Sequence, residues 1–80
     1  MKIEIFTKKN CHKCKILKRI FTEENIEFEE VDIHQYPTWA EDLKDRGFTS
    51  IPVVSVNNFS HTFSGIRQNE LKKLRENEYE

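Results

Sequence analysis

A strand pattern that runs straight into a cysteine-led helix most constrains how this chain can fold. Residues 2–6 alternate apolar and charged side chains, with Ile3 and Ile5 on one face of the expected strand. After a polar turn over residues 7–10, apolar residues recur at helical spacing: Cys14, Leu17, Ile20 and Phe21. A strand followed at once by a helix begins a βαβ unit, in which a right-handed crossover joins two parallel strands. The sequence therefore predicts an α/β fold.

The rest of the chain continues to alternate strands and helices. The first helix is expected to end near Asn25. The further elements expected are a strand through 28–33, a helix from Pro37 to Gly47, a hairpin of strands over 51–56 and 59–64, and a helix over 67–78. The acidic end, residues 76–80, is expected to fray, because carboxylates at a helix C-terminus oppose the helix dipole. The predicted order is βαβαββα in a single domain, residues 1–80.

Composition limits the partners that bulk charge can attract. The formal net charge is −1, from 13 basic and 14 acidic residues, so we expect neither nucleic acid nor a membrane surface as partner. No apolar run approaches the ~18 residues of a membrane span. Met1 leads directly into the first strand pattern with no signal peptide, so we expect the protein in the cytoplasm. We also expect a monomer.

The motif Cys11-His12-Lys13-Cys14 contains the only two cysteines of the chain. Two thiols at this spacing can pass electron pairs, because one thiolate attacks a partner's disulfide and the other resolves the mixed disulfide. The N–H groups of a helix N-terminus and the helix dipole favour a thiolate, and so do the nearby Lys8, Lys9 and Lys13. We expect Cys11, nearer the loop, to attack and Cys14, one turn deeper, to resolve.

Other uses of the cysteine pair stay open at this point. A structural disulfide would close only a tiny loop and constrain the unfolded chain little. A zinc site would need two more ligands, and the candidates His12, His34 and His61 are scattered surface residues without a second close-spaced pair. His12 could stabilise the Cys11 thiolate or simply face solvent.

A second motif, Thr49-Ser50-Ile51-Pro52, precedes a valine-rich strand. Together with the cysteine pair it resembles the thioredoxin superfamily, in which a cis-proline begins the third strand and lies against the dithiol. The resemblance implies the thioredoxin/glutaredoxin fold, with a four-stranded mixed sheet flanked by three helices. It also implies a cis Pro52 and a backbone at Ile51 that pairs with a substrate segment like an added strand. A trans proline at the start of an edge strand is the alternative.

Four segments, residues 5–11, 47–48, 51–54 and 64–67, are similar to the NrdH-type redoxins, which are glutaredoxin-like in fold. That resemblance implies a dithiol electron carrier, the hydrogen donor of class Ib ribonucleotide reductase. Thioredoxin reductase would re-reduce it with NADPH, and the carrier itself would bind no cofactor or metal.

The segment Ser64-Gly65-Ile66-Arg67-Gln68 bears on the choice between this group and its relatives. Glutathione-binding glutaredoxins usually carry paired glycines and an acidic or hydroxyl cluster there, which holds the ammonium group of glutathione. Arg67 would repel that group, although it could also act only as a local cap. The alternatives are a glutathione-dependent glutaredoxin and, in another class, a non-catalytic zinc-binding or interaction module.

The expected partner surface surrounds Cys11. An exposed apolar patch of Phe48, Ile51 and Phe63 is predicted to form a small, weak docking surface suited to turnover. The remaining residues expected to contact partners are Lys8, His12, Lys13, Pro52, Gly65 and Arg67.

Overall fold

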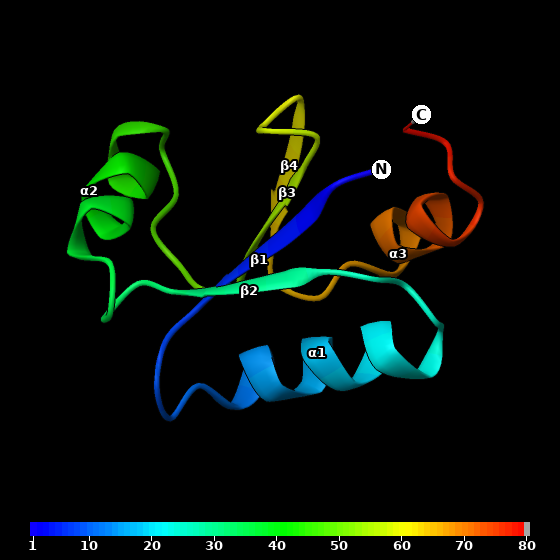
Figure 1. The fold of residues 1–80 in the computed structure, drawn as a ribbon, viewed down its shortest axis with the longest axis horizontal. Helices are drawn as coiled ribbons and strands as arrows, with labels where there is room; N and C mark the ends of the chain where they lie inside the picture. Colours follow the sequence, from blue (N-terminus) through cyan, green and yellow to red (C-terminus); the bar gives the residue numbers. More distant parts are fainter. Residues whose placement is uncertain (80) are drawn as a thin grey trace.

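A computed structural model describes residues 1–79 as one mixed sheet with three helices packed against it (Figure 1). In chain order the elements are β1 (Ile3–Thr7), α1 (His12–Glu23), β2 (Glu29–Asp32), α2 (Pro37–Asp45), β3 (Val53–Val56), β4 (His61–Ser64) and α3 (Gln68–Arg75). The predicted order βαβαββα and the predicted fold class are confirmed.

The strands lie in the order β2-β1-β3-β4. β1 and β2 are parallel and are joined through α1, whereas β3 is antiparallel to both β1 and β4. Phe6 near the end of β1 pairs with Val53 at the start of β3, and Val53 also pairs with Ser64 at the end of β4. The sheet therefore brings the segments after β1, before β3 and after β4 together at one end.

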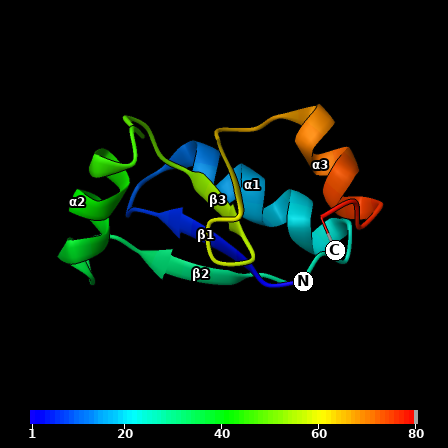
Figure 2. The ribbon, with the colours of Figure 1, turned by 90° about the horizontal axis from the view of Figure 1, so that it is seen from above.

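Two apolar clusters cover the two faces of the sheet, with β3 buried on both. Helices α1 and α3 cover one face, where the cluster consists of Ile3, Ile5, Leu17, Phe21, Val54, Val56, Phe63, Leu71 and Leu74. Helix α2 covers the other face, where Phe6, Leu43 and Val53 are fully buried. Figure 2 shows α2 and α3 at opposite sides of the molecule, with the sheet between them.

Helices α1 and α2 end in the same way, at the residues that the sequence indicates. Asn25 and Gly47 follow the two helices with positive φ angles of 58° and 92°. The next N–H group turns back into each helix, from Ile26 to the Phe21 carbonyl at 2.8 Å and from Phe48 to the Leu43 carbonyl at 2.9 Å. These bonds satisfy carbonyl groups that the helix itself leaves without partners.

The hairpin differs from prediction, because β3 begins at Val53 and β4 only at His61. Asn57, Asn58 and Phe59 form the connecting turn with φ angles of 51°, 55° and 66°. This left-handed path turns the Phe59 ring back onto the α2 face, where it stacks on Phe6 with ring centroids 5.6 Å apart. Burial of an aromatic ring thus outweighs the strand pattern of residues 59–60.

The last helix is shorter than the predicted 67–78, and the segment after it, expected to fray, makes specific contacts through Tyr79. Helix α3 ends at Arg75, yet the Tyr79 hydroxyl donates a hydrogen bond to Glu70 Oε2 at 2.6 Å. The Tyr79 ring also stacks on His61 with centroids 4.3 Å apart. His61, expected at the surface, is therefore partly covered and contacts Glu70 at 2.6 Å through Nε2. Residue 80 lies outside the described part of the chain.

Candidate functional site

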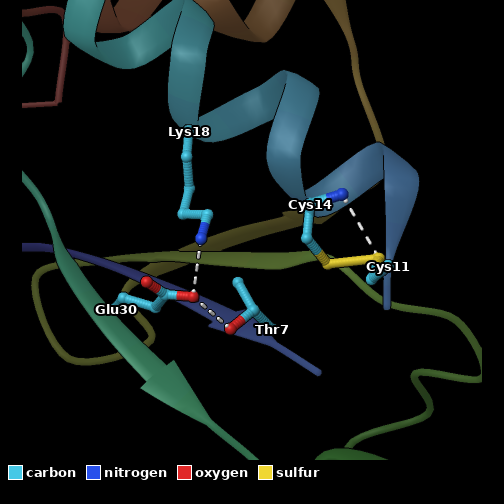
Figure 3. The surroundings of a disulfide bond; sticks show 5 residues. All are labelled: Thr7, Cys11, Cys14, Lys18 and Glu30. Carbon is cyan, nitrogen blue, oxygen red and sulfur yellow. Dashed lines mark hydrogen bonds and ion pairs between the residues drawn. A yellow bond between two sulfur atoms is a disulfide. The ribbon is translucent and has the colours of Figure 1, made fainter. Parts of the chain in front are cut away.

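Cys11 and Cys14 form a disulfide at the N-terminus of α1, with their Cα atoms 5.3 Å apart. Both side chains are buried, and Cys11 is the more exposed at 8% against 2% for Cys14, as predicted. Cys11 is the residue that caps α1, and its sulfur accepts a hydrogen bond from the Cys14 N–H at 3.2 Å (Figure 3). An N–H group aimed at this sulfur, at the positive end of a helix dipole, stabilises negative charge on it.

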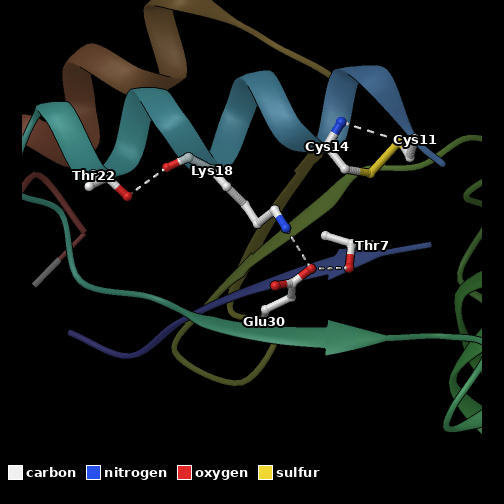
Figure 4. A network of polar contacts seen from close by, with 6 residues as sticks. All are labelled: Thr7, Cys11, Cys14, Lys18, Thr22 and Glu30. Atoms are coloured by element: carbon white, nitrogen blue, oxygen red, sulfur yellow. Dashed lines mark hydrogen bonds and ion pairs between the residues drawn. A yellow bond between two sulfur atoms is a disulfide. The ribbon is translucent and has the colours of Figure 1, made fainter. Parts of the chain in front are cut away.

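A polar group that the sequence interpretation missed lies beside the disulfide on the sheet side of α1 (Figures 3 and 4). Thr7, buried at the end of β1, donates its hydroxyl hydrogen to Glu30 Oε2 at 2.7 Å. Lys18 Nζ on α1 binds the same oxygen at 3.0 Å. Burial alone would raise the pKa of Glu30, but the hydrogen bonds from Thr7 and Lys18 outweigh it and lower that pKa.

The sequence carries a signal for this group. Phe28 immediately precedes β2 and Glu30 lies two residues later, so both side chains point toward α1. The Glu30 side chain nevertheless stays 42% exposed, so Thr7 and Lys18 hold it at the solvent edge of the α1 face rather than in the core. The imperfect alternation around Glu29-Glu30 thus coincides with a polar contact, in which Glu30 on β2 binds Thr7 on β1 and Lys18 on α1.

The second motif lies at the same end of the sheet as the cysteine loop. The Ile51–Pro52 peptide bond is cis, as the resemblance implies. Pro52 is buried, and its carbonyl accepts the Gly65 N–H at 2.8 Å. Gly65 has a φ of 77°, which favours glycine at this position. Ile51 forms no backbone hydrogen bond with any residue of 1–79, so its peptide groups are open to a partner.

Phe48 and Ile51 line an apolar hollow of about 340 Å³ between α2 and residues 47–51, which we call the α2 hollow. Its other lining residues are Ile33, Ala40, Leu43, Lys44, Gly47, Thr49 and Ser50. The prediction that Phe63 joins this patch is wrong. Phe63 is only 6% exposed and belongs to the cluster under α1 and α3, on the opposite face of the sheet.

The charged candidates form no hydrogen bond or ion pair with one another among residues 1–79. Lys8, His12, Lys13 and Arg67 are all exposed, and only Arg67 has a polar contact, from Nε to the Ser64 carbonyl at 3.2 Å. That contact matches the local role considered for Arg67. In the described residues 1–79, no group of three or more histidine, cysteine or acidic side chains could hold a metal ion. No helix among these residues is long and apolar enough to cross a membrane.

Comparisons with known proteins agree with this geometry. The family model described as Glutaredoxin matches residues 3–60. A "Glutaredoxin-like protein NrdH" of Lactococcus lactis is 36% identical over 72 residues, which cover 90% of this chain and 97% of that protein. The protein of the same name from Salmonella typhimurium is 35% identical over 74 residues, covering 92% of this chain and 89% of that protein.

Among solved structures, the NrdH-redoxin of Escherichia coli superimposes with a TM-score of 0.85 at 31% identity. The superposition covers 92% of this chain and 95% of that one. The structure is described as the basis for a "thioredoxin-like activity profile" of a glutaredoxin-like protein.

Proposed function

This chain belongs to the glutaredoxin family, among the NrdH-type glutaredoxin-like thiol–disulfide oxidoreductases, and we propose that it carries electrons from thioredoxin reductase to a class Ib ribonucleotide reductase. The observation that carries the proposal is the Cys11 sulfur, which caps α1 and accepts the Cys14 N–H at 3.2 Å. A sulfur in that position is activated as a nucleophile, and its partner cysteine lies within bonding distance.

In the proposed reaction the reduced Cys11 thiolate attacks one sulfur of the client disulfide, and the other client sulfur leaves as a thiolate. The Cys14 thiolate then attacks the Cys11 sulfur, which releases the second client thiolate and closes the Cys11–Cys14 disulfide. Two electrons and the two thiol protons pass to the client. The reductase returns two electrons, ultimately from NADPH, and no cofactor needs to be bound by the carrier.

The backbone beside Pro52 supports docking of an extended client segment. The peptide groups of Ile51 are unpaired within residues 1–79, so they can bind the client backbone as an added strand does. The α2 hollow begins at the same residue and offers an apolar surface for a neighbouring client side chain. Such a contact is small, which allows release after each transfer.

Two observations favour thioredoxin reductase over glutathione as the electron source. Arg67 places an exposed positive charge where a glutathione-dependent protein would need to hold an ammonium group. The E. coli relative is described by a thioredoxin-like activity profile. We further propose a cytoplasmic location, since a reducing compartment keeps such a dithiol available as a donor.

A coupled assay tests the electron source. With NADPH and thioredoxin reductase, the protein should reduce a disulfide substrate and consume NADPH, whereas glutathione with glutathione reductase should support little turnover. The Cys11→Ser variant is the control and should be inactive with either system. Turnover supported by glutathione alone would show that the protein is a glutathione-dependent glutaredoxin.

A further inference from the structure

The segment that carries both cysteines is strongly basic, although the whole chain is nearly neutral. Residues 8–22 contain six basic and no acidic side chains, a formal charge of +6, whereas the rest of the chain carries −7. Lys18 and Arg19 are paired, with Glu30 at 3.0 Å and with Glu23 at 3.7 Å. The other four are exposed and form no ion pair with any described residue: Lys8, Lys9, Lys13 and Lys15. We call these four lysines the basic collar.

The two collar residues that lie on α1, Lys13 and Lys15, are unfavourable for that helix. Lys13 and Lys15 occupy the first turn of α1, where the helix dipole is positive, and no acidic residue occupies that turn. Glu23 and Glu24 lie at the opposite end, where the dipole is negative. Both placements are the reverse of what stabilises a helix. Rules of local stability are most often broken where a surface serves binding.

We propose that the basic collar docks an acidic peptide segment, namely a client segment with carboxylates within a few residues of its disulfide. This inference rests on the proposed carrier function and specifies its substrate class. The collar residues flank Cys11 in the chain, two in the preceding loop and two in the first turn of α1. A segment that pairs with the Ile51 backbone and presents its sulfur to Cys11 carries its flanking side chains past these charges. Attraction between opposite charges then raises the rate of encounter.

Synthetic peptide disulfides of one sequence, with glutamate, glutamine or lysine beside the cysteines, provide the test. The second-order rate constant for oxidation of the reduced protein would be measured with each peptide at about 20 mM and about 300 mM salt. At low salt the glutamate peptide should react at least about tenfold faster than the glutamine peptide, and the lysine peptide should be slowest. At high salt the three rates should converge, because exposed charges are screened.

Charge-reversal variants locate the effect. Lys9→Glu and Lys13→Glu, made as separate single variants, should each lower or invert the ratio of the glutamate rate to the lysine rate. This ratio is unaffected by any change in thiolate reactivity, since both peptides meet the same sulfur. The matched control is Lys72→Glu, on α3, whose last turn reaches the far end of α1 through Arg75 and Glu24 at 3.2 Å. The control should keep the wild-type ratio.

The outcomes separate this inference from the carrier function. Equal rates for all three peptides, with a small neutral disulfide still reduced, would overturn the docking inference and leave the carrier function intact. A ratio lost equally in Lys72→Glu would also overturn it, because net charge alone would then explain the preference. Failure to reduce any disulfide would reject both proposals.

Discussion

At the scale of single residues, one sulfur atom serves both the fold and the chemistry. The Cys11 sulfur takes the place that a serine or aspartate oxygen usually has at a helix N-terminus, since it accepts the Cys14 N–H. A thiolate at this atom would satisfy the same N–H group more strongly than a disulfide sulfur does. After reduction, the Cys14 N–H group therefore stabilises the Cys11 thiolate that the first step of the reaction requires.

A second residue, Tyr79, ties the C-terminal segment to α3. Its hydroxyl donates to Glu70, and this bond lowers the pKa of Glu70, helped by His61 and opposed by burial. Burial and the adjacent Glu70 carboxylate in turn raise the pKa of Tyr79. The contact is consequently strongest when Glu70 is ionised and Tyr79 is protonated.

Tyr79→Phe removes this hydrogen bond and keeps the aromatic ring. The free energy of unfolding at neutral pH should fall by about 1 kcal/mol, the usual net worth of such a bond. Because the pKa of Glu70 is lowered on folding, its contribution is present above the unfolded value of 4.5 and is lost as the pH falls through the folded value. The difference between variant and wild type should therefore shrink in acid, as measured by urea unfolding at several pH values.

Tyr36→Phe is the matched control, since Tyr36 is 56% exposed and its hydroxyl has no partner among the described residues. It should change stability little at any pH. An equal loss in both variants, or a Tyr79→Phe loss that grows on acidification, would contradict the role given to Glu70.

At the scale of elements, two phenylalanines have different roles: Phe63 on β4 belongs to the core, whereas Phe48 after α2 lines the proposed docking surface. Phe63→Ala should lower the free energy of unfolding by about 3–5 kcal/mol, because the ring is buried under α1 and α3. Phe48→Ala should cost clearly less stability, since Phe48 is only partly buried, but should raise KM in the coupled thioredoxin reductase assay. Urea unfolding and steady-state kinetics measure the two effects. A large stability loss at Phe48 with unchanged KM would contradict this division.

The elements also show which features the sequence could predict. The start of α1 and the ends of α1 and α2 could be predicted because their signals are local: a cysteine at the start of α1, Asn25 and Gly47 after the helix ends. The end of α3 could not be predicted, because the helix stops at Arg75 rather than near residue 78. The face of the sheet on which Phe63 lies could not be predicted either, because alternation in a strand of four residues does not say which helices will cover each face. The start of β4 was missed because burial of Phe59 depends on α2.

The candidate site likewise contains some residues that the sequence predicts and some contacts that only the structure shows. Cys11, Cys14 and Pro52 are recognisable from spacing and resemblance, and their positions are as expected. The contact of Glu30 with Thr7 and Lys18 joins three elements, so the sequence indicates only an irregular strand at residues 29–30, and the partners depend on the packing of α1 over β1 and β2. The anchoring of Tyr79 likewise depends on a contact nine residues away in the chain.

At the scale of the whole molecule, the sheet gathers the reactive parts at one end. The cysteine loop follows β1, the cis peptide precedes β3 and Gly65 follows β4, and strand pairing holds these three segments in register. The remaining structure supports this end of the sheet through a buried cluster on each face. The central claim is that this end passes electron pairs, with Cys11 as the attacking sulfur and Cys14 as the resolving one.

Trapping of the mixed disulfide tests that claim most directly. Reduced Cys14→Ser, mixed with a disulfide substrate, should accumulate a covalent complex through Cys11, identified by mass spectrometry of the linked peptides. The reciprocal Cys11→Ser variant should accumulate little, because Cys14 is more buried and lacks the N–H contact made to Cys11. A stable complex through Cys14 in Cys11→Ser, with none through Cys11 in Cys14→Ser, would reverse the two roles and contradict the account.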